Sequence, residues 1–380
     1  EMCIRDRPRG KQVKNPHAIW YTPVSGIWQT VWLEPVSSKY ISNVVSVADI
    51  DNKNLKVKVG TQNTTSSDVV QIVLKEQNTI VAMTKGVVGE TLELALADVK
   101  LWSPESPFLY DLEVTLLDKG KKTDKVKSYA AMRKISMHKD KDGIMRMQLN
   151  NKDCFQFGPL DQGWWPDGLY TAPTDEALAY DIEKTKDWGF NMIRKHIKVE
   201  PARWYTHCDR LGILVWQDMP SGDNSPKWIQ YNYFDGKENE RSIESEENFK
   251  KEWREIMDYL MPYPSIVVWV PFNEAWGQFK TEEIARWTKN YDPSRLVNPA
   301  SGGNHYTCGD MLDLHNYPAP DLYLYDAQRA TVLGEFGGIG LACEGHLWEP
   351  SRNWGYVEFK SGEAATAEYL KYAGMLLQLI

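Results

Sequence analysis

The chain has 380 residues, of which 42% are hydrophobic, and its formal net charge is −8 at pH 7. This length predicts two or three domains, and the acidic balance argues against a nucleic-acid partner, because nucleic-acid binding selects basic patches. No apolar run is long enough for a membrane helix, and the 5 scattered cysteines lack metal-ligand spacing, which predicts free thiols.

Residues 1–10 are charged, lack the apolar core of a signal peptide and do not resemble a natural start. We expect them to lie outside the fold and the chain to be a fragment. Export cannot be judged from this end, so a periplasmic or secreted location stays open. Residues 11–38 contain two apolar segments around a turn signal at residues 23–26. We interpret residues 1–38 as the remnant of a preceding β-domain.

Residues 39–138 are predicted to form an immunoglobulin-like β-sandwich. Short, partly alternating apolar segments follow one another there, with polar or glycine-containing turns between them and no helical periodicity. The number of segments, about seven, suits one domain of this kind.

From residue 139 to residue 380, short apolar strands alternate with helical stretches, which is the pattern of a parallel α/β fold. The expected strands are 155–159, 191–196, 213–218, 266–272, 296–299, 312–317 and 331–334. The expected helices are 174–188, 201–211, 242–260, 281–290 and 363–380. We therefore predict a (β/α)8 TIM barrel that is incomplete, because the chain stops before an eighth strand.

Two of these strands lead into a glutamate. Residues 266–272 are followed by Asn273 and Glu274, and residues 331–334 are followed by Glu335. Since a barrel gathers the carboxyl ends of its strands at one face, both carboxyls are predicted to share a pocket, and such a pair is the usual chemistry of glycoside hydrolysis. The alternative is that each glutamate only caps a strand at the surface.

Neighbouring residues favour a pocket that binds a sugar. Asn273 can donate a hydrogen bond to a sugar hydroxyl or to the partner carboxylate, and Trp276 can supply an apolar wall that raises the pKa of Glu274. Arg194, on another strand of the same barrel end, is the best candidate to pair with Glu335 and lower its pKa. Several of the 16 tryptophans flank strand ends, where their faces can stack on sugar rings, although most large aromatics fill cores.

Four motifs follow one another along the chain: SGIWQTVWLE at 25–34, LWSPESPFLY at 101–110, GFNMIR at 189–194 and CDRLGILV at 208–215. With Asn273-Glu274 and Glu335 they resemble glycoside hydrolase family 2, the β-galactosidase and β-glucuronidase family, over about residues 16–380. The resemblance implies that the motif at residues 25–34 is the end of a jelly-roll sugar-binding domain. It also implies retaining exo-hydrolysis of a β-linked sugar, with Glu274 as acid/base, Glu335 as nucleophile and Tyr317 as a hydrogen-bond partner of the nucleophile.

The second barrel strand departs from better-known members of this family, in which the arginine is followed by Ser-His-Tyr-Pro. Here Arg194 is followed by Lys-His-Ile-Lys. His196 and Lys198 are therefore local candidates for sugar contacts, and a hydrogen-bonded core histidine is an equal alternative for His196.

Two more strand ends supply candidate sugar contacts. The loop at residues 158–167 replaces the usual first barrel loop, and we expect Asp161 and Trp165 from it to form a subsite, against the alternative of plain loop structure. Asp218 ends the third strand, where it can contact a hydroxyl or act only as a cap.

The favoured activity is that of a β-galactosidase without a cofactor, and β-glucuronidase and β-mannosidase are alternatives within the family. A non-catalytic carbohydrate-binding protein on the same scaffold is a hypothesis of another class. His196, Asp218 and His315 could form a metal site, but no His-x-His signature supports one, so no metal is predicted. The expected partner is a glycoside or oligosaccharide substrate, with no nucleic acid and no membrane. The oligomeric state stays open, a homo-oligomer included.

Overall fold

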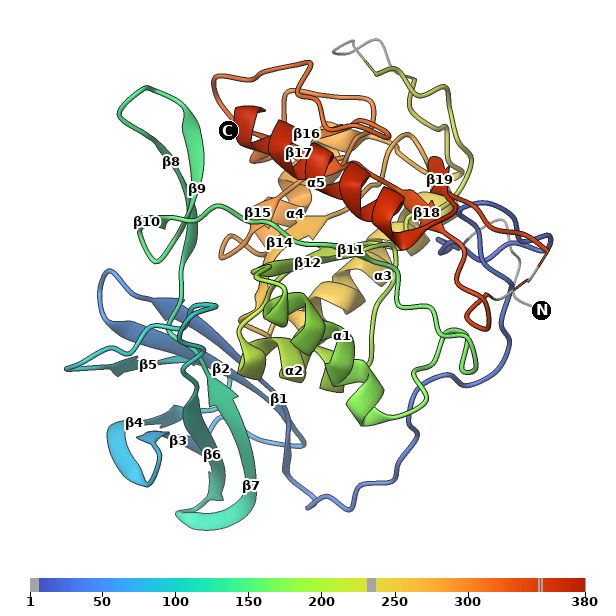
Figure 1. The fold of residues 1–380 in the computed structure, drawn as a ribbon. Helices are drawn as coiled ribbons and strands as arrows, with labels where there is room; N and C mark the ends of the chain where they lie inside the picture. Colours follow the sequence, from blue (N-terminus) through green and yellow to red (C-terminus); the bar gives the residue numbers. More distant parts are fainter. Residues whose placement is uncertain (1–6, 231–236, 348, 350, 380) are drawn as a thin grey trace.

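The computed structural model of the chain describes residues 7–230, 237–347, 349 and 351–379. A β-sandwich lies beside an α/β barrel, and an extended N-terminal segment runs past the barrel to the start of the sandwich (Figure 1). None of the described helices combines the length and the apolar character needed to span a bilayer.

The predicted immunoglobulin-like sandwich is confirmed, and all residues from 40 to 130 are described. Its two sheets have the strand orders β1-β2-β5 and β4-β3-β6-β7. Its strands are β1 (Tyr40–Asp49), β2 (Asn54–Gln62), β3 (Val69–Glu76), β4 (Thr79–Val87), β5 (Thr91–Ala95), β6 (Tyr110–Asp118) and β7 (Lys121–Ala130). In β6 the alternate residues Leu112, Val114 and Leu116 are buried, because successive side chains of a strand point to opposite faces.

The predicted TIM-barrel architecture is observed as parallel strands that follow one another around the barrel. Its strands are β11 (Leu160–Asp161), β12 (Met192–Lys195), β13 (Leu214–Asp218), β14 (Ile266–Val270), β15 (Leu296–Val297), β16 (Met311–His315) and β17 (Ala330–Glu335). β11 to β15 form one sheet in chain order, and β16 pairs with β17. The first strand was expected at residues 155–159, but its pairing with β12 starts at Leu160. Among the described strands, β11 pairs only with β12 and β17 only with β16.

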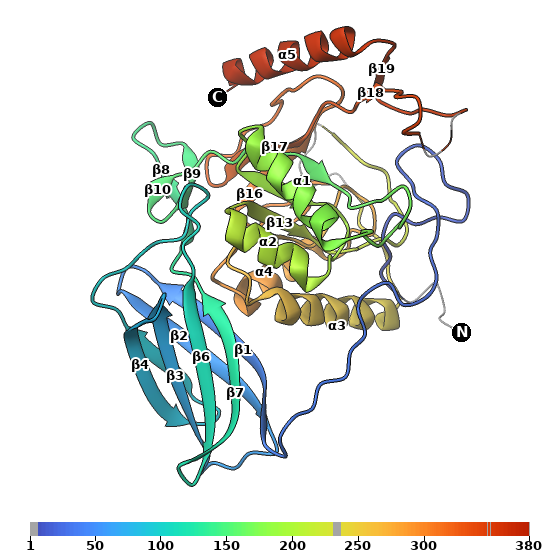
Figure 2. The same ribbon diagram turned by 60° about the horizontal axis from the view of Figure 1, so that its bottom comes forward.

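Helices pack around the barrel strands (Figure 2). They are α1 (Asp175–Asp187), α2 (Ala202–Leu211), α3 (Ile243–Leu260) and α4 (Thr281–Tyr291), whereas α5 (Gly362–Leu379) contacts a separate two-stranded sheet. α1 and α3 start at hydroxyl caps, since the side chains of Thr174 and Ser242 each accept a hydrogen bond from a backbone N–H of the first turn. Gly212 ends α2 in the left-handed conformation, with a φ of 76°.

Two short sheets were not predicted. The strands β8 (Ile135–Lys139), β9 (Met145–Leu149) and β10 (Lys152–Asp153) form an antiparallel sheet between the sandwich and the barrel. β18 (Ile339–Leu341) pairs in parallel with β19 (Val357–Phe359), and α5 contacts both of these strands.

The expectation that residues 7–10 lie outside the fold is wrong. The backbone N–H of Arg9 donates to the carbonyl of Gly222 at 3.2 Å, and the N–H of Gly222 donates back to the carbonyl of Arg9 at 2.9 Å. Gly222 lies in the loop after β13, so this segment is fixed to the carboxyl end of the barrel. Residues 1–6 of the same expectation lie outside the described residues.

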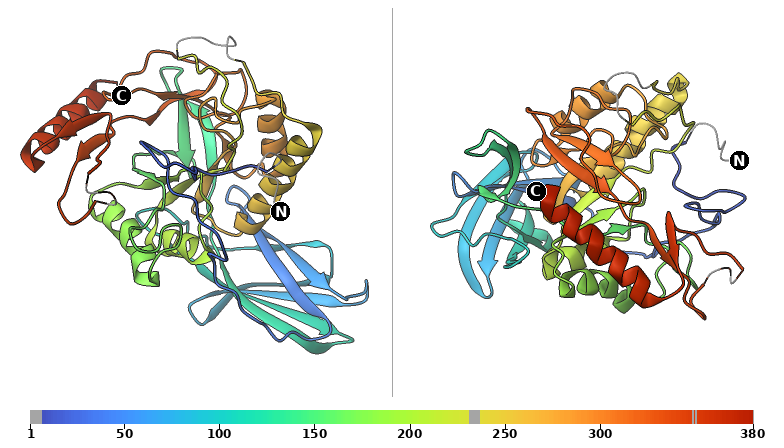
Figure 3. Two further views of the ribbon diagram at one scale, coloured as in Figure 1. Left: turned by 90° about the vertical axis from the view of Figure 1, so that its right-hand side faces the viewer. Right: turned by 45° about the horizontal axis from the view of Figure 1, so that its top comes forward.

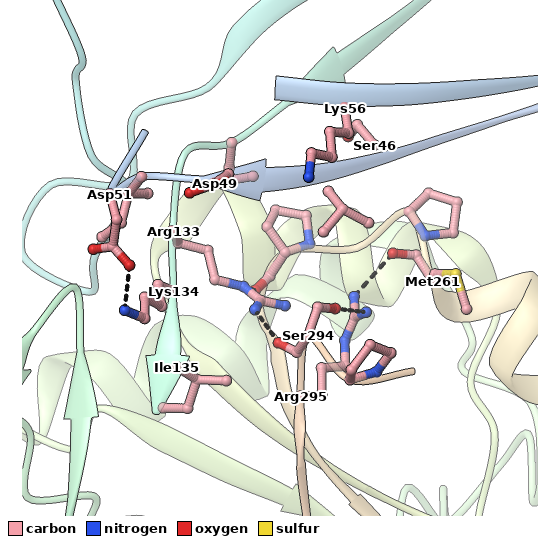
Figure 4. A pocket seen from close by; sticks show the side chains of 17 residues that line it. Ser46, Asp49, Asp51, Lys56, Arg133, Lys134, Ile135, Met261, Ser294 and Arg295 are labelled. Atoms are coloured by element: carbon pink, nitrogen blue, oxygen red, sulfur yellow. Dashed lines mark hydrogen bonds and ion pairs between the residues drawn. The ribbon is translucent and has the colours of Figure 1, made fainter. Parts of the chain in front are cut away.

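A buried arginine connects the sandwich with the barrel. Arg133 donates hydrogen bonds to the carbonyl groups of Pro264, Ser294 and Ile266, at 2.8 to 2.9 Å. A cavity of about 330 Å³ opens beside Arg133 and Arg295 at this junction (Figure 4), and neither candidate catalytic glutamate lines it.

A second contact between the two parts uses the carboxyl of Asp209 on α2. It accepts a hydrogen bond from the hydroxyl of Tyr129 at 2.6 Å and another from the N–H of Ser265 at 2.8 Å. Burial raises the pKa of Asp209 to about 7.

Replacing Arg133 with methionine should lower the free energy of unfolding by about 2 to 4 kcal/mol, because buried carbonyl groups lose their donors. Urea unfolding followed by tryptophan fluorescence measures this loss. Arg146→Met is the matched control, since Arg146 is partly exposed and pairs with Asp140 on a surface hairpin. Equal losses of unfolding free energy in the two variants would contradict the conclusion that Arg133 stabilises the contact between sandwich and barrel.

Asp209→Asn should change how stability depends on pH. A carboxyl whose pKa is higher in the folded state contributes stability that is fully present below its unfolded pKa and is lost as the pH rises through its folded pKa, here about 7. The amide mimics the protonated carboxyl, so the parent chain should lose stability relative to the variant between about pH 4 and pH 8. Urea unfolding across this range tests the expectation, and a difference that stays constant with pH contradicts it.

Candidate active site

Glu274 and Glu335 follow or end the strands β14 and β17, at the same face of the barrel. One oxygen of each carboxylate and one ring nitrogen of His315 all lie within 4.8 Å of one another. Carboxyl groups about 5 to 5.5 Å apart are typical of retaining glycosidases, whereas inverting enzymes need a wider gap. The two strand ends therefore bring both glutamates into one pocket at the shorter spacing.

The backbone of Glu274 adopts an uncommon conformation. Its φ is +53°, in the left-handed region that non-glycine residues rarely occupy. Its N–H donates to the carbonyl of Ser301 at 2.7 Å, and Asn273 forms backbone bridges with Ser301 and Trp276. These contacts hold a strained residue in place, which is typical of functional sites.

The carboxylate of Glu335 is enclosed by donors. Arg194 Nη1 donates to Oε1 at 2.8 Å, and the Tyr317 hydroxyl donates to Oε2 at 2.7 Å. The His315 ring Nδ1 lies 3.4 Å from Oε2. Burial by itself raises the pKa of Glu335, but the positive charges of His315 and Arg194 outweigh burial and hold this pKa below its usual range.

Glu274 has a different environment from Glu335. Its side chain is 37% exposed, against 7% for Glu335. Its Oε1 lies 3.2 Å from His315 Nδ1, so the imidazole stands between the two carboxylates. Burial lowers the pKa of His315, but Glu335 and Glu274 outweigh it and raise this pKa above the usual value. The carboxylate of Glu335 is thus held ionised in the interior, whereas that of Glu274 is partly open to solvent.

Arg194 connects the strand ends around the pair. Its Nε and Nη2 donate to the two carboxylate oxygens of Asp218 at 3.1 and 2.9 Å, and Nη2 also donates to Asn273 Oδ1 at 2.8 Å. Asp218 is only 1% exposed and is paired with the arginine, and its role as a sugar contact stays a prediction. The predicted pairing of Arg194 with Glu335 is present in the structure.

His315 is held by a buried network that sequence reasoning missed. Its Nε2 lies 2.8 Å from the hydroxyl of Ser301, and that hydroxyl donates to Asp313 Oδ2 at 2.5 Å. Gly302 makes room for the ring, because a Cβ at this position would lie 2.1 Å from an imidazole carbon. Asp313 and His315 are two residues apart on β16, a spacing that predicts side chains on one face of the strand.

The expectation that Asp161 contacts the sugar is not supported by its position. Its carboxylate pairs with Lys195 Nζ at 2.7 Å, and this ammonium lies 4.2 Å from the ring centroid of Trp204 on α2. Arg194 and Lys195 are consecutive residues of β12, so their side chains point to opposite faces. Asp161 therefore lies on the helix-facing side, away from the catalytic pair. Lys198 likewise pairs with Glu200, at 3.0 Å.

The roles of three further residues stay predictions: Trp276, Trp165 and His196. Trp276 is nearly buried, and its ring packs edge-to-face against Trp20 with centroids 5.1 Å apart. The indole N–H of Trp165 is buried and has no hydrogen-bond partner within the described residues. His196 lies 3.1 Å from Asp218 Oδ2 through Nδ1, but neither ring nitrogen makes a well-oriented hydrogen bond to a described residue.

Two residues near the pair come from segments that carried no signal. Tyr356 stacks on Tyr317, with ring centroids 3.8 Å apart and an interplanar angle of 14°. Lys11, from the segment before the sandwich, is 9% exposed. Burial lowers the pKa of Lys11 below its usual value, and the charges of Glu335 and Glu274 offset this lowering only in part.

By distance alone, Glu274, His315 and Glu335 could hold a metal ion. Arg194 and Tyr317, however, already donate to both oxygens of Glu335, and the pKa of His315 is raised toward the protonated form, which is no ligand. The arrangement therefore favours a hydrogen-bonded acid pair over a metal centre, and the metal-free site stays a prediction.

Comparison with known proteins places this geometry in a family. The family model for glycosyl hydrolases family 2 matches residues 34–133, and its TIM barrel domain model matches residues 171–318, so together they cover more than half of the chain. A β-galactosidase of Lactococcus lactis is 25% identical over 306 residues, which are 76% of this chain and 27% of that protein. A putative β-glucuronidase of Formosa agariphila is 27% identical over 272 residues, 66% of this chain and 29% of its own length.

Solved structures share the fold. The β-D-glucuronidase of Dictyoglomus thermophilum has a TM-score of 0.69 at 18% identity, covering 90% of this chain and 60% of that one. The Bacteroides uniformis β-glucuronidase has a TM-score of 0.63 at 19% identity, covering 81% and 42%. The chain spans only about a quarter of the length of the curated relatives it matches. With both domain models matched in order and the barrel observed, the chain belongs to glycoside hydrolase family 2.

Proposed function

We propose that this chain carries the active site of a retaining β-glycosidase, in which Glu335 is the nucleophile and Glu274 the acid/base. The observation that supports this most is the pair of carboxylates within 4.8 Å in contrasting environments. A nucleophile must be ionised and held still, which fits the buried Glu335. An acid/base must reach the leaving group and water, which fits the partly exposed Glu274.

The proposed reaction has two displacements. Glu335 attacks the anomeric carbon, the glycosidic C–O bond breaks, and Glu274 gives its proton to the departing oxygen. Glu274 then takes a proton from a water molecule, which attacks the same carbon and releases Glu335. Arg194 and Tyr317 hold the nucleophile in place by their hydrogen bonds to its two oxygens.

We favour a β-galactoside as the substrate, and a β-glucuronide is the second candidate. Curated relatives named as β-galactosidases support the first. A relative named as a putative β-glucuronidase supports the second. Hydrolysis of a panel of nitrophenyl glycosides by the chain distinguishes the two substrate classes.

Glu335→Gln should reduce kcat/KM for every cleaved glycoside by a factor of about a thousand or more, because no covalent intermediate can form. In the parent chain a 2-deoxy-2-fluoroglycoside should add its sugar mass to Glu335, which peptide mass spectrometry detects. Glu344→Gln, at an exposed position in the following loop, is the control. Sugar binding without any label would instead support a carbohydrate-binding protein.

Glu274→Gln should affect substrates according to their leaving group. A dinitrophenyl glycoside needs no proton to depart, so its first step should persist, whereas cleavage of a methyl glycoside should fall by about a hundredfold or more. Burst kinetics and rates for the two substrates measure the difference, with Glu282→Gln on α4 as the control. The same loss for both substrates would contradict an acid/base role.

A further inference from the structure

The junction between the sandwich and the barrel contains a buried cation that has no carboxylate partner. Arg133 is 7% exposed, and it donates hydrogen bonds to the carbonyl groups of Pro264, Ser294 and Ile266. Among the described residues it forms no ion pair. Carbonyl groups satisfy its donors but do not neutralise its charge. Because a buried charge is costly unless it is paired, this guanidinium favours an anion as a further partner.

The cavity beside Arg133 has room for a small molecule. Its volume is about 330 Å³, and ligand pockets usually measure about 300 to 1,000 Å³. Figure 4 shows Arg133 and Lys56 reaching toward this space from different segments of the chain. In both views of Figure 3 the sandwich lies on one side of the barrel, and the cavity is formed where these two parts meet.

The charges around the cavity do not balance. The lining contains four cations and two carboxylates, which are Lys56, Arg133, Lys134, Arg295, Asp49 and Asp51. Lys134 pairs with Asp51, and Arg295 pairs with Asp292, which lies outside the lining. Lys56 and Arg133 are left with Asp49 alone, and among the described residues neither is within ion-pair distance of that carboxylate. The lining therefore has an excess of positive charge.

The guanidinium of Arg133 has donors to spare. An arginine carries five N–H groups in a planar fork, and three of them serve the carbonyl groups, so two stay available. Burial, and next the charge of Arg295, lower the pKa of Arg133 to about 9. The group is therefore still protonated at pH 7, and an anion beside it would offset the cost of its burial.

We propose that this cavity is a binding site for a phosphate group, carried by inorganic phosphate or by a small sugar phosphate, and that Arg133 and Lys56 donate to its oxygens. Two cations from different segments suit an ion with several acceptor oxygens and more than one negative charge. Arginine in particular binds phosphate through its planar fork.

The proposed phosphate site is separate from the pair of glutamates. Pro264 and Arg295 line it, and they lie just before the first residues of β14 and β15. Glu274, in contrast, follows the carboxyl end of β14. The two sites thus lie at opposite ends of the barrel strands, and phosphate binding can be tested whether or not the chain hydrolyses a glycoside.

Calorimetry with the 380-residue chain, at constant ionic strength, measures the binding of inorganic phosphate, D-glucose 6-phosphate and neutral D-glucose. At least one of the two phosphate compounds should bind at one site per chain, and more tightly than glucose. Lys56→Gln should weaken this binding by about tenfold, because a hydrogen bond between charged partners is lost. Arg133→Met should abolish it.

Lys58→Gln is the matched control, because Lys58 is an exposed lysine two residues further along β2 and does not line the cavity. This variant should bind phosphate as the parent chain does. Melting temperatures show whether each variant folds. If Arg133→Met does not fold, the comparison of Lys56→Gln with Lys58→Gln decides the matter by itself.

Two outcomes support the proposal and identify the ligand. Tighter binding of glucose 6-phosphate assigns the site to a sugar phosphate, and tighter binding of inorganic phosphate assigns it to the free ion. Two other outcomes overturn it. One is that neither phosphate compound binds the parent chain at millimolar concentrations. The other is equal affinity in Lys56→Gln and Lys58→Gln, as would follow if phosphate occupied the catalytic pocket.

Discussion

The buried guanidinium of Arg194 is the interaction on which the rest of the site depends. It joins β12 to the ends of β13, β14 and β17 through Asp218, Asn273 and Glu335. Its planar fork suits this task, since five N–H donors in fixed directions can serve several acceptors at once. The same contact positions the ionised glutamate and holds the strand ends together, so geometry and charge at this pocket cannot be altered independently.

Because Arg194 donates to Glu335, the two glutamates have different surroundings. Glu335 is surrounded by donors in the interior, whereas Glu274 sits on a strained backbone at the edge of the pocket. His315 lies between them and can share its charge with either. A barrel can produce such asymmetry because each strand end offers its own backbone direction and its own neighbours.

Much of the fold was predictable from the sequence, because sandwich and barrel strands have different apolar patterns. The glutamates and Arg194 were predictable for a related reason: each stands at or near the end of a buried strand, and such ends meet at one face. The partner of Asp161 was not predictable, because the loop sequence does not show that Lys195 would draw it to the helix-facing side. Lys11 was missed, because a charged N-terminal stretch has no periodicity, and its position depends on backbone pairing with a residue more than two hundred positions away.

The attachment of that N-terminal stretch to the barrel mouth has a consequence for how the parts of this chain can be separated. The strands β14 and β17, which lead to Glu274 and Glu335, belong to the barrel itself. The segment that precedes the sandwich is held to the same face by the pairing of Arg9 with Gly222 and by the packing of Trp20 against Trp276. Excising the barrel alone would therefore strip this cover from the face on which the two glutamates lie.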